Sequence, residues 1–238
     1  GKMFIPAKIL NKPDKLTDEE FDIMKTHTLI GYKMCIDDIR LRPYALGPKY
    51  HHETLDGTGY PEGLEGSSIP YEDQIIKVAD DYDALVTKRQ YKTHIHISDT
   101  LKDLIKDTTP NIKVAALDNA AQGVKLGKLN KKVVKALFKV VIDDTYYEIS
   151  CVSGYVDYLK NQIKRIEQIL EYEEKMEKAH TEKKKNYYKE GMEILFEEGE
   201  NFSNIHKIYH EYQTAYITRK EIVEKLYEEI KIIKKLQV

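Results

Sequence analysis

"HHETLDGTGYPEGLEGSSIP", residues 51–70, places two adjacent histidines and a carboxylate directly before a run of glycines and prolines. Glycine and proline at this density interrupt regular secondary structure, so the sequence predicts a rigid loop here. A histidine doublet alone is weak support for metal binding, because most histidines lie on the surface or are satisfied in the core. The helical patterns on both sides of this loop decide the fold class.

The segment before the loop, residues 15–34, is predicted to be a helix. Thr17 and Glu20 have the spacing of a capping box, which satisfies free backbone N–H groups at a helix start. One face is traced by residues at helical steps: Phe21, Met24, Thr28 and Tyr32. His27 is therefore expected on this helix.

A second helix is predicted after the loop, over residues 71–88, where Pro70 supplies a start signal. Its apolar stripe is expected to comprise Ile75, Ile76, Ala79, Tyr82 and Val86. Asp80 and Asp83 are three positions apart and thus lie on the same side of this helix.

The remaining sequence is also helical in pattern. Residues 98–150 are predicted to form helices with a break near Thr109-Pro110, and apolar residues then follow steps of three and four from Val152 to Leu170. A turn is expected around Gly199, followed by a second such seam from Ile205 to Ile233. No segment reads as a strand, so the expected fold class is all-α, with a C-terminal antiparallel hairpin or bundle.

Composition limits the classes of partner and compartment. The 238-residue chain has a net charge of −2, which disfavours a nucleic acid polymer or an anionic membrane as partner. No apolar run approaches the ~20 residues of a membrane span. Cys35 and Cys151 have no metal or redox spacing and are expected to be small buried residues. A soluble cytoplasmic protein is the expectation.

The candidate ligands contain nitrogen and oxygen but no sulfur. Adjacent residues on a helix point about 100° apart, so His51 and His52 would best serve one metal ion each. With His27 and the aspartates Asp80 and Asp83 they form a mixed imidazole and carboxylate set. Such a set suits iron, manganese or zinc rather than a closed structural zinc site.

Three stretches together resemble the HD-GYP domains, a branch of the HD superfamily of metal-dependent phosphohydrolases: "GKMFIPAKILNKPDKLTDEEFDIMKTHTLIGYKM", "HHETLDGTGYPEGLEGSSIP" and "IIKVADDYDALVTKRQYK". The resemblance covers about residues 1–92 and extends more loosely to 145. It implies a helical domain of bacterial signalling that hydrolyses cyclic di-GMP to pGpG or GMP through a hydroxide activated by two or three divalent metal ions, iron or manganese first and zinc second.

The resemblance also implies roles for individual residues. The implied metal ligands are His27, His51, His52 and Asp80. Asp83 resembles the aspartate that orients or deprotonates the attacking water, and Lys2 would assist at the substrate phosphate. Arg89 and Lys92 resemble residues that hold this phosphate, and Tyr60 of the Gly-Tyr-Pro signature could contact substrate or a partner.

The sequence departs from the family pattern at its start. Family members read His-Asp-x-Gly-Lys, whereas this chain begins with Gly1-Lys2. The expectation is an HD-GYP-like domain over residues 1–150 without its N-terminal helices, and a helical extension over 151–238. The extension or the Gly-Tyr-Pro loop could mediate a homodimer or bind a partner protein. Two alternatives stay open: an impaired domain that binds cyclic di-GMP or a protein, and an HD-type phosphohydrolase with another nucleotide substrate.

Overall fold

The computed structural model describes residues 1–90, 97–110 and 126–236, without the side chains of residues 88–90. Every regular element within these ranges is helical, as the sequence predicted, and the only β-type pairing there is an isolated bridge between Asp56 and Glu65. The chain divides into two compact units, Gly1–Val140 with Ile233–Val238, and Val141–Ile232. None of the described helices is long and apolar enough to cross a membrane.

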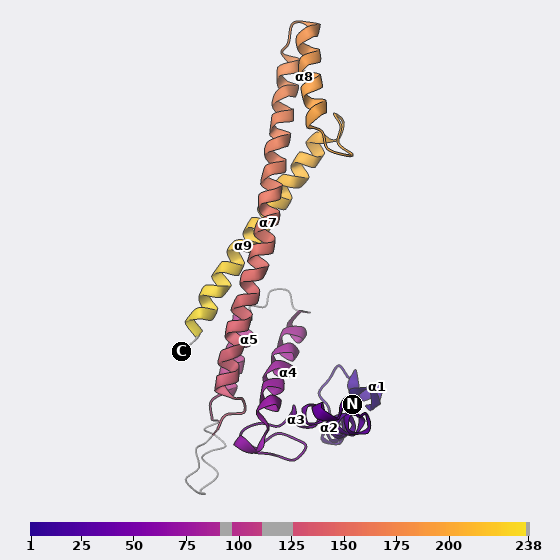
Figure 1. Ribbon diagram of the computed structural model, residues 1–238, viewed down its shortest axis with the longest axis vertical. Helices are drawn as coiled ribbons and strands as arrows, with labels where there is room; N and C mark the ends of the chain where they lie inside the picture. Colours follow the sequence, from indigo (N-terminus) through magenta and orange to yellow (C-terminus); the bar gives the residue numbers. More distant parts are fainter. Residues whose placement is uncertain (91–96, 111–125, 237–238) are drawn as a thin grey trace. The chain divides into compact units, whose positions relative to one another are not determined.

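The first unit begins with short helices around α2 (Asp18–Asp37) (Figure 1). These are η1 (Lys2–Phe4), α1 (Ala7–Leu10), η2 (Arg42–Tyr44) and α3 (Leu46–Tyr50). The predicted capping box is confirmed: Thr17 Oγ1 accepts from the Glu20 amide, and the Glu20 carboxylate accepts from the Thr17 amide. This cap fixes where α2 starts and hence which face carries His27.

Helices α2 and α3 approach closely at a glycine. A Cβ at Gly31 would lie 3.0 Å from Cβ of Pro48, so a larger residue would push α3 outward. Gly31 and Thr28 are buried on the same face of α2 as His27. Because Pro48 precedes the histidine doublet by only three positions, this approach places His51 against His27.

The other helices of this unit are α4 (Tyr71–Gln90), which follows the short η3 (Gly66–Ser68), then α5 (Ile97–Asp107) and the start of α7 (Lys131–Glu177). The buried apolar residues of these helices include Val78, Leu101, Leu104, Val133, Val134 and Phe138. The predicted stripe on α4 is wrong in part, since Ile75 and Ile76 are 45% and 41% exposed, whereas Val78 is 2% exposed. Periodicity identified a helix, but the neighbours of α4 decide which face is buried.

The second unit contains α7 from Val141 onward, α8 (Glu182–Leu195) and α9 (Ile205–Leu236) up to Ile232. These helices form a hairpin in which α8 and then α9 return along α7 (Figure 1). Its core cluster is formed by Ile166 and Ile169 of α7, Met192 of α8 and Ile205 of α9. The predicted antiparallel seam and the turn at Gly199, where φ is +86°, are thereby confirmed.

Cys151 is exposed on α7 and Cys35 is half-buried, so the prediction of buried cysteines is wrong.

One ion pair connects the segment between α8 and α9, residues 196–204, to α7. Both outer nitrogens of Arg165 donate to the Glu200 carboxylate at 2.6 Å, and Nη1 also donates to the Leu195 carbonyl at 2.6 Å. The Glu200 side chain is 5% exposed, and Arg165 holds the pKa of this carboxyl below its usual value. A bidentate pair of this burial restricts the connecting segment to one conformation.

We therefore expect Arg165→Met to lower the free energy of unfolding of the helical hairpin by about 2 kcal/mol, because Glu200 would stay buried without its cation. Urea unfolding followed by circular dichroism at 222 nm measures this change. The matched control is Lys175→Met, which breaks an exposed pair with Glu171 on the same helix and should cost less than about 0.5 kcal/mol. Equal effects of the two substitutions would contradict the prediction.

Candidate metal centre

Three histidines from α2 and from the end of α3 form a cluster. His27 lies on α2 and is 4% exposed, His51 caps α3, and His52 is the next residue. One nitrogen of each ring lies within 4.8 Å of the others. The prediction that the His51 and His52 rings diverge on a helix is wrong, because α3 ends at Tyr50 and the two ring centroids are only 4.1 Å apart. All three rings can therefore reach a common ion.

Hydrogen bonds determine the protonation of two of these rings. Nδ1 of His27 lies 2.7 Å from the Met24 carbonyl oxygen, and Nδ1 of His51 lies 2.9 Å from the Pro48 carbonyl oxygen. A carbonyl only accepts, so each Nδ1 carries the proton, and Nε2 of each neutral ring presents a lone pair. These two Nε2 atoms face each other at 3.2 Å.

Two lone pairs at this distance repel each other unless a proton or a cation lies between them. Burial is the first cause that lowers the pKa of both His27 and His51, which disfavours a bound proton at neutral pH. For His52, burial and then the neighbouring His51 and His27 lower the pKa to about 2. Neutral imidazoles held by backbone carbonyls are a suitable donor set for a divalent metal ion.

A carboxylate and an aromatic ring complete the surroundings of His52. Asp80 Oδ2 of α4 lies 3.9 Å from His52 Nδ1, and this aspartate is about one-third exposed. Tyr60 stacks on His52 with ring centroids 4.7 Å apart and meets Phe21 edge-on at 5.8 Å. Burial, followed by the charges of Asp80 and Asp81, raises the pKa of Tyr60 to about 12. The hydroxyl therefore stays protonated beside the centre.

The N-terminal part of the chain matches a known family. The family model described as "HD domain" matches residues 1–110. Over these residues the chain is similar to the HD domain family, and the segment 1–110 is called the HD domain below. Within the HD domain, the histidine cluster lies where α2 and α3 meet the loop that starts at residue 51.

Relatives of the HD domain are phosphodiesterases by name. The "cyclic di-GMP phosphodiesterase response regulator RpfG" of Xanthomonas campestris is 46% identical over 94 residues, which are 39% of this chain and 25% of that protein. The "cyclic di-GMP phosphodiesterase" of Thermotoga maritima is 41% identical over 107 residues, 44% of this chain and 29% of that protein. A "3'3'-cGAMP-specific phosphodiesterase 2" of Vibrio cholerae is 40% identical over 95 residues, 39% of this chain and 18% of that protein. The chain thus spans about a quarter of the length of the first two.

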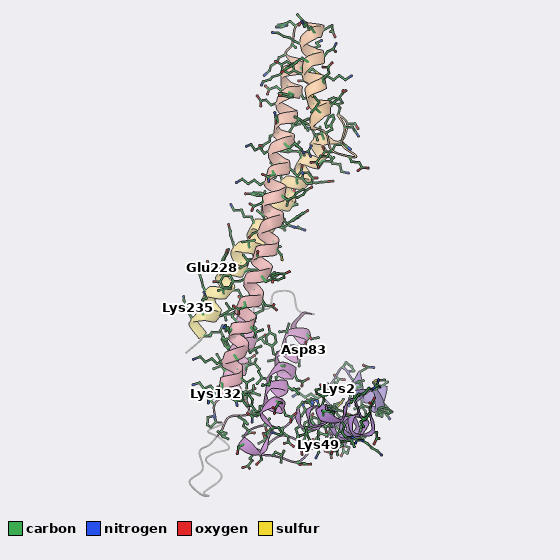
Figure 2. The ribbon with its side chains drawn as sticks, in the orientation of Figure 1. Lys2, Lys49, Asp83, Lys132, Glu228 and Lys235 are labelled. Atoms are coloured by element: carbon green, nitrogen blue, oxygen red, sulfur yellow. The ribbon has the colours of Figure 1, made fainter. Side chains whose placement is uncertain are left out.

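The other predicted site residues occupy different environments in the HD domain. Lys2 lies in η1, and its charge reaches the cluster, where it lowers the pKa of His27 and His52. Figure 2 shows Lys2 among the short helices near α2, whereas Asp83 projects from α4. Asp83 is exposed. Arg89 lies in the last turn of α4 with its side chain outside the description, and Lys92 lies outside the described residues.

A buried carboxylate that the sequence analysis did not single out organises the loop. Glu53 is 2% exposed and accepts three backbone N–H groups: Oε1 from Glu62 at 2.7 Å and Gly63 at 3.2 Å, and Oε2 from Leu64 at 2.9 Å. A Cβ at Gly59 would lie 2.4 Å from the Thr54 amide nitrogen, so only glycine fits there. Glu53 is the residue after the doublet, and a carboxylate between a histidine pair and a glycine-rich loop is the signal that could have found it.

Asp73, near the start of α4, has a buried carboxyl group in which one oxygen makes no hydrogen bond to the described residues. It is 2% exposed, and among the described residues Oδ2 has no hydrogen-bond partner. Burial first, and then the charge of Glu72, raise its pKa above the usual 3.8. The folded state therefore binds this proton more tightly than the unfolded state does. Its stabilising contribution is present below pH 3.8 and is lost as the pH rises through the folded pKa.

At pH 7 the protein thus carries the cost of a buried, ionised Asp73. We expect Asp73→Ala to raise the free energy of unfolding at pH 7 by about 1 kcal/mol, with a smaller gain near pH 4. Thermal unfolding between pH 4 and pH 8 measures this difference. Glu72→Ala, which removes an exposed carboxylate from the same turn, is the control and should change stability by less than about 0.5 kcal/mol. A loss of stability in Asp73→Ala at pH 7 would show that its carboxylate has a stabilising partner.

Proposed function

We propose that this chain is the catalytic part of a metal-dependent phosphodiesterase that opens cyclic di-GMP to linear pGpG and, in a second step, to GMP. The observation that carries the proposal is the pair of facing Nε2 lone pairs of His27 and His51 at 3.2 Å, in an HD domain whose relatives are named cyclic di-GMP phosphodiesterases. A cation is the natural occupant between two such atoms.

In this proposal His27, His51, His52 and Asp80 hold divalent ions, iron or manganese in preference to zinc. Such ions, when bound, would activate a water molecule and neutralise charge on the phosphodiester. The protein's own contribution is orientation: the Met24 and Pro48 carbonyls fix two imidazoles, and the Tyr60 ring fixes a third.

The remaining predicted roles are proposals of the same kind. Asp83, three residues after Asp80 on α4, would orient the attacking water and accept its proton. Lys2, beside the cluster, would neutralise a phosphate oxygen, and Arg89 and Lys92 would hold the phosphate. Tyr60 could contact the substrate through its hydroxyl, since one of its ring faces covers His52. We further propose a cytoplasmic bacterial protein whose HD domain extends to about residue 150, with the segment 151–238 available to a second copy or a partner protein.

The test combines metal analysis with a hydrolysis assay. The 238-residue chain, loaded anaerobically with Fe²⁺ or Mn²⁺, should convert cyclic di-GMP to pGpG, as resolved by ion-exchange chromatography, and EDTA should stop the reaction. His206→Gln, an exposed histidine of α9, should leave turnover unchanged. A chain that binds neither metal would contradict the proposal, and one that binds cyclic di-GMP with metal but without turnover would support a binding role instead.

A second candidate substrate is 3'3'-cGAMP, because two Vibrio cholerae relatives are named 3'3'-cGAMP-specific phosphodiesterases at 40% and 35% identity. Both cyclic dinucleotides share the phosphodiester ring and differ in one base. Parallel assays of the two substrates at equal concentration distinguish the candidates by the ratio of their kcat/KM values. A ratio that favours 3'3'-cGAMP would replace the first candidate by the second.

A further inference from the structure

Helix α4 carries an ion pair next to the candidate metal centre that none of the proposed steps uses. Lys77 Nζ lies 2.7 Å from Asp81 Oδ1, one helical turn later. The pair is largely enclosed, because the Lys77 side chain is 13% exposed and the Asp81 side chain 27%. Asp80, the candidate ligand, is three positions after Lys77 and thus also within one helical turn, yet the lysine pairs with Asp81.

The position of the pair connects it to the centre. Lys77 lines a small cavity of about 10 Å³, large enough for one water molecule, together with Glu53, the neighbour of His52. Asp81 directly follows Asp80 on α4, and Asp80 Oδ2 lies 3.9 Å from His52 Nδ1. Both members of the pair therefore lie within about one helical turn of the candidate ligand Asp80.

We propose that the Lys77–Asp81 ion pair sets the affinity of the His27–His51–His52 centre for divalent cations by balancing one positive and one negative charge beside it. Lys77 and Asp81 act as positioning residues, since neither is placed as a ligand. With the pair intact, their charges nearly cancel at the ion, and Lys77 keeps Asp81 from binding the ion in place of Asp80. The inference rests on metal binding as stated in the proposed function.

Because Lys77 and Asp81 carry charges of opposite sign, their removal should have opposite effects on the affinity for Mn²⁺. Lys77→Met leaves Asp81 negative and should tighten Mn²⁺ binding by about tenfold, because a partly enclosed charge is incompletely screened from a divalent ion. Asp81→Asn leaves Lys77 positive and should weaken binding by about tenfold. The double variant Lys77→Met/Asp81→Asn should return to within about twofold of the unmodified chain. Isothermal titration calorimetry with Mn²⁺ on the 238-residue chain measures all four constants.

Two measurements keep the test independent of folding and of catalysis. Lys102→Met removes a lysine from an exposed pair with Asp99 on α5 and should leave the Mn²⁺ affinity unchanged. Thermal unfolding identifies any variant that does not fold. If Lys77→Met is one, Asp81→Asn and the double variant still differ in their expected Mn²⁺ affinity, which is about tenfold weaker in the first and nearly unchanged in the second.

The outcomes separate this inference from the proposed function. If both single variants weaken Mn²⁺ binding, or if neither changes it, the pair has only a structural role and the inference is wrong. If the unmodified chain binds no Mn²⁺, the inference and the metal premise of the proposed function fail together. Opposite shifts in affinity without any hydrolysis of cyclic di-GMP would support the inference and contradict the proposed function alone.

Discussion

Glu53→Gln is expected to lower the free energy of unfolding of the N-terminal unit by about 3 kcal/mol, although it replaces only one oxygen by an NH₂ group. The Glu53 carboxylate accepts from the amides of Glu62, Gly63 and Leu64, so both oxygens are occupied. In glutamine an NH₂ group replaces one of the two oxygens, so that this donor would face a backbone N–H group, which is also a donor. At least one buried N–H then loses its partner, and a charge-assisted contact is lost as well.

The effect should extend from the loop to the metal centre. Tyr60 stacks on His52, and its amide donates to the His52 carbonyl at 3.3 Å, so a displaced loop releases one side of this imidazole. Hydrogen exchange of the Glu62, Gly63 and Leu64 amides should accelerate most, and Mn²⁺ affinity should fall by about tenfold.

Glu65→Gln is the matched control, because it alters an exposed carboxylate of the same loop and should change stability by less than about 0.5 kcal/mol. Unchanged exchange of the three amides in Glu53→Gln would show that their hydrogen bonds do not depend on the negative charge.

His27→Gln is expected to abolish metal binding while it stabilises the metal-free protein. Loss of one of three imidazole ligands should reduce Mn²⁺ affinity by at least about 100-fold. Any metal-dependent hydrolysis should fall by about 10³-fold, since the ion contributes several kcal/mol to catalysis. In the same variant the glutamine amide can donate to His51 Nε2, where the native structure has two facing lone pairs at 3.2 Å.

This relief should raise the free energy of unfolding in EDTA by about 1 kcal/mol. Calorimetric titration with Mn²⁺ and thermal unfolding in EDTA measure the two effects separately. His206→Gln serves as the control in both experiments, since this histidine is exposed and pairs with Glu173 on α7. Retained Mn²⁺ affinity in His27→Gln would exclude His27 as a ligand, and a less stable metal-free variant would show that the lone pairs do not repel.

The local features of this protein could be predicted from its sequence because they depend on residues a few positions apart. The Thr17–Glu20 capping box, the helices over residues 15–34 and 71–88, and the turn at Gly199 are all set by backbone propensity and spacing. The signature loop after the histidine doublet predicted the family, and the family model confirms it for residues 1–110.

Other features were decided only by the tertiary structure, because they depend on which faces of the helices pack together. The exposure of Ile75 and Ile76 and the burial of Val78 follow from the helices that pack on α4, which periodicity cannot specify. The histidine rings converge because α3 ends before the doublet and Pro48 packs on Gly31. Glu53 is buried because the loop folds back so that three amides, nine to eleven residues later in the chain, donate to its carboxylate. The pairing of Lys77 with Asp81 rather than Asp80 follows from side-chain geometry. Sequence spacing therefore determined the helices, whereas the close approach of distant segments determined the site.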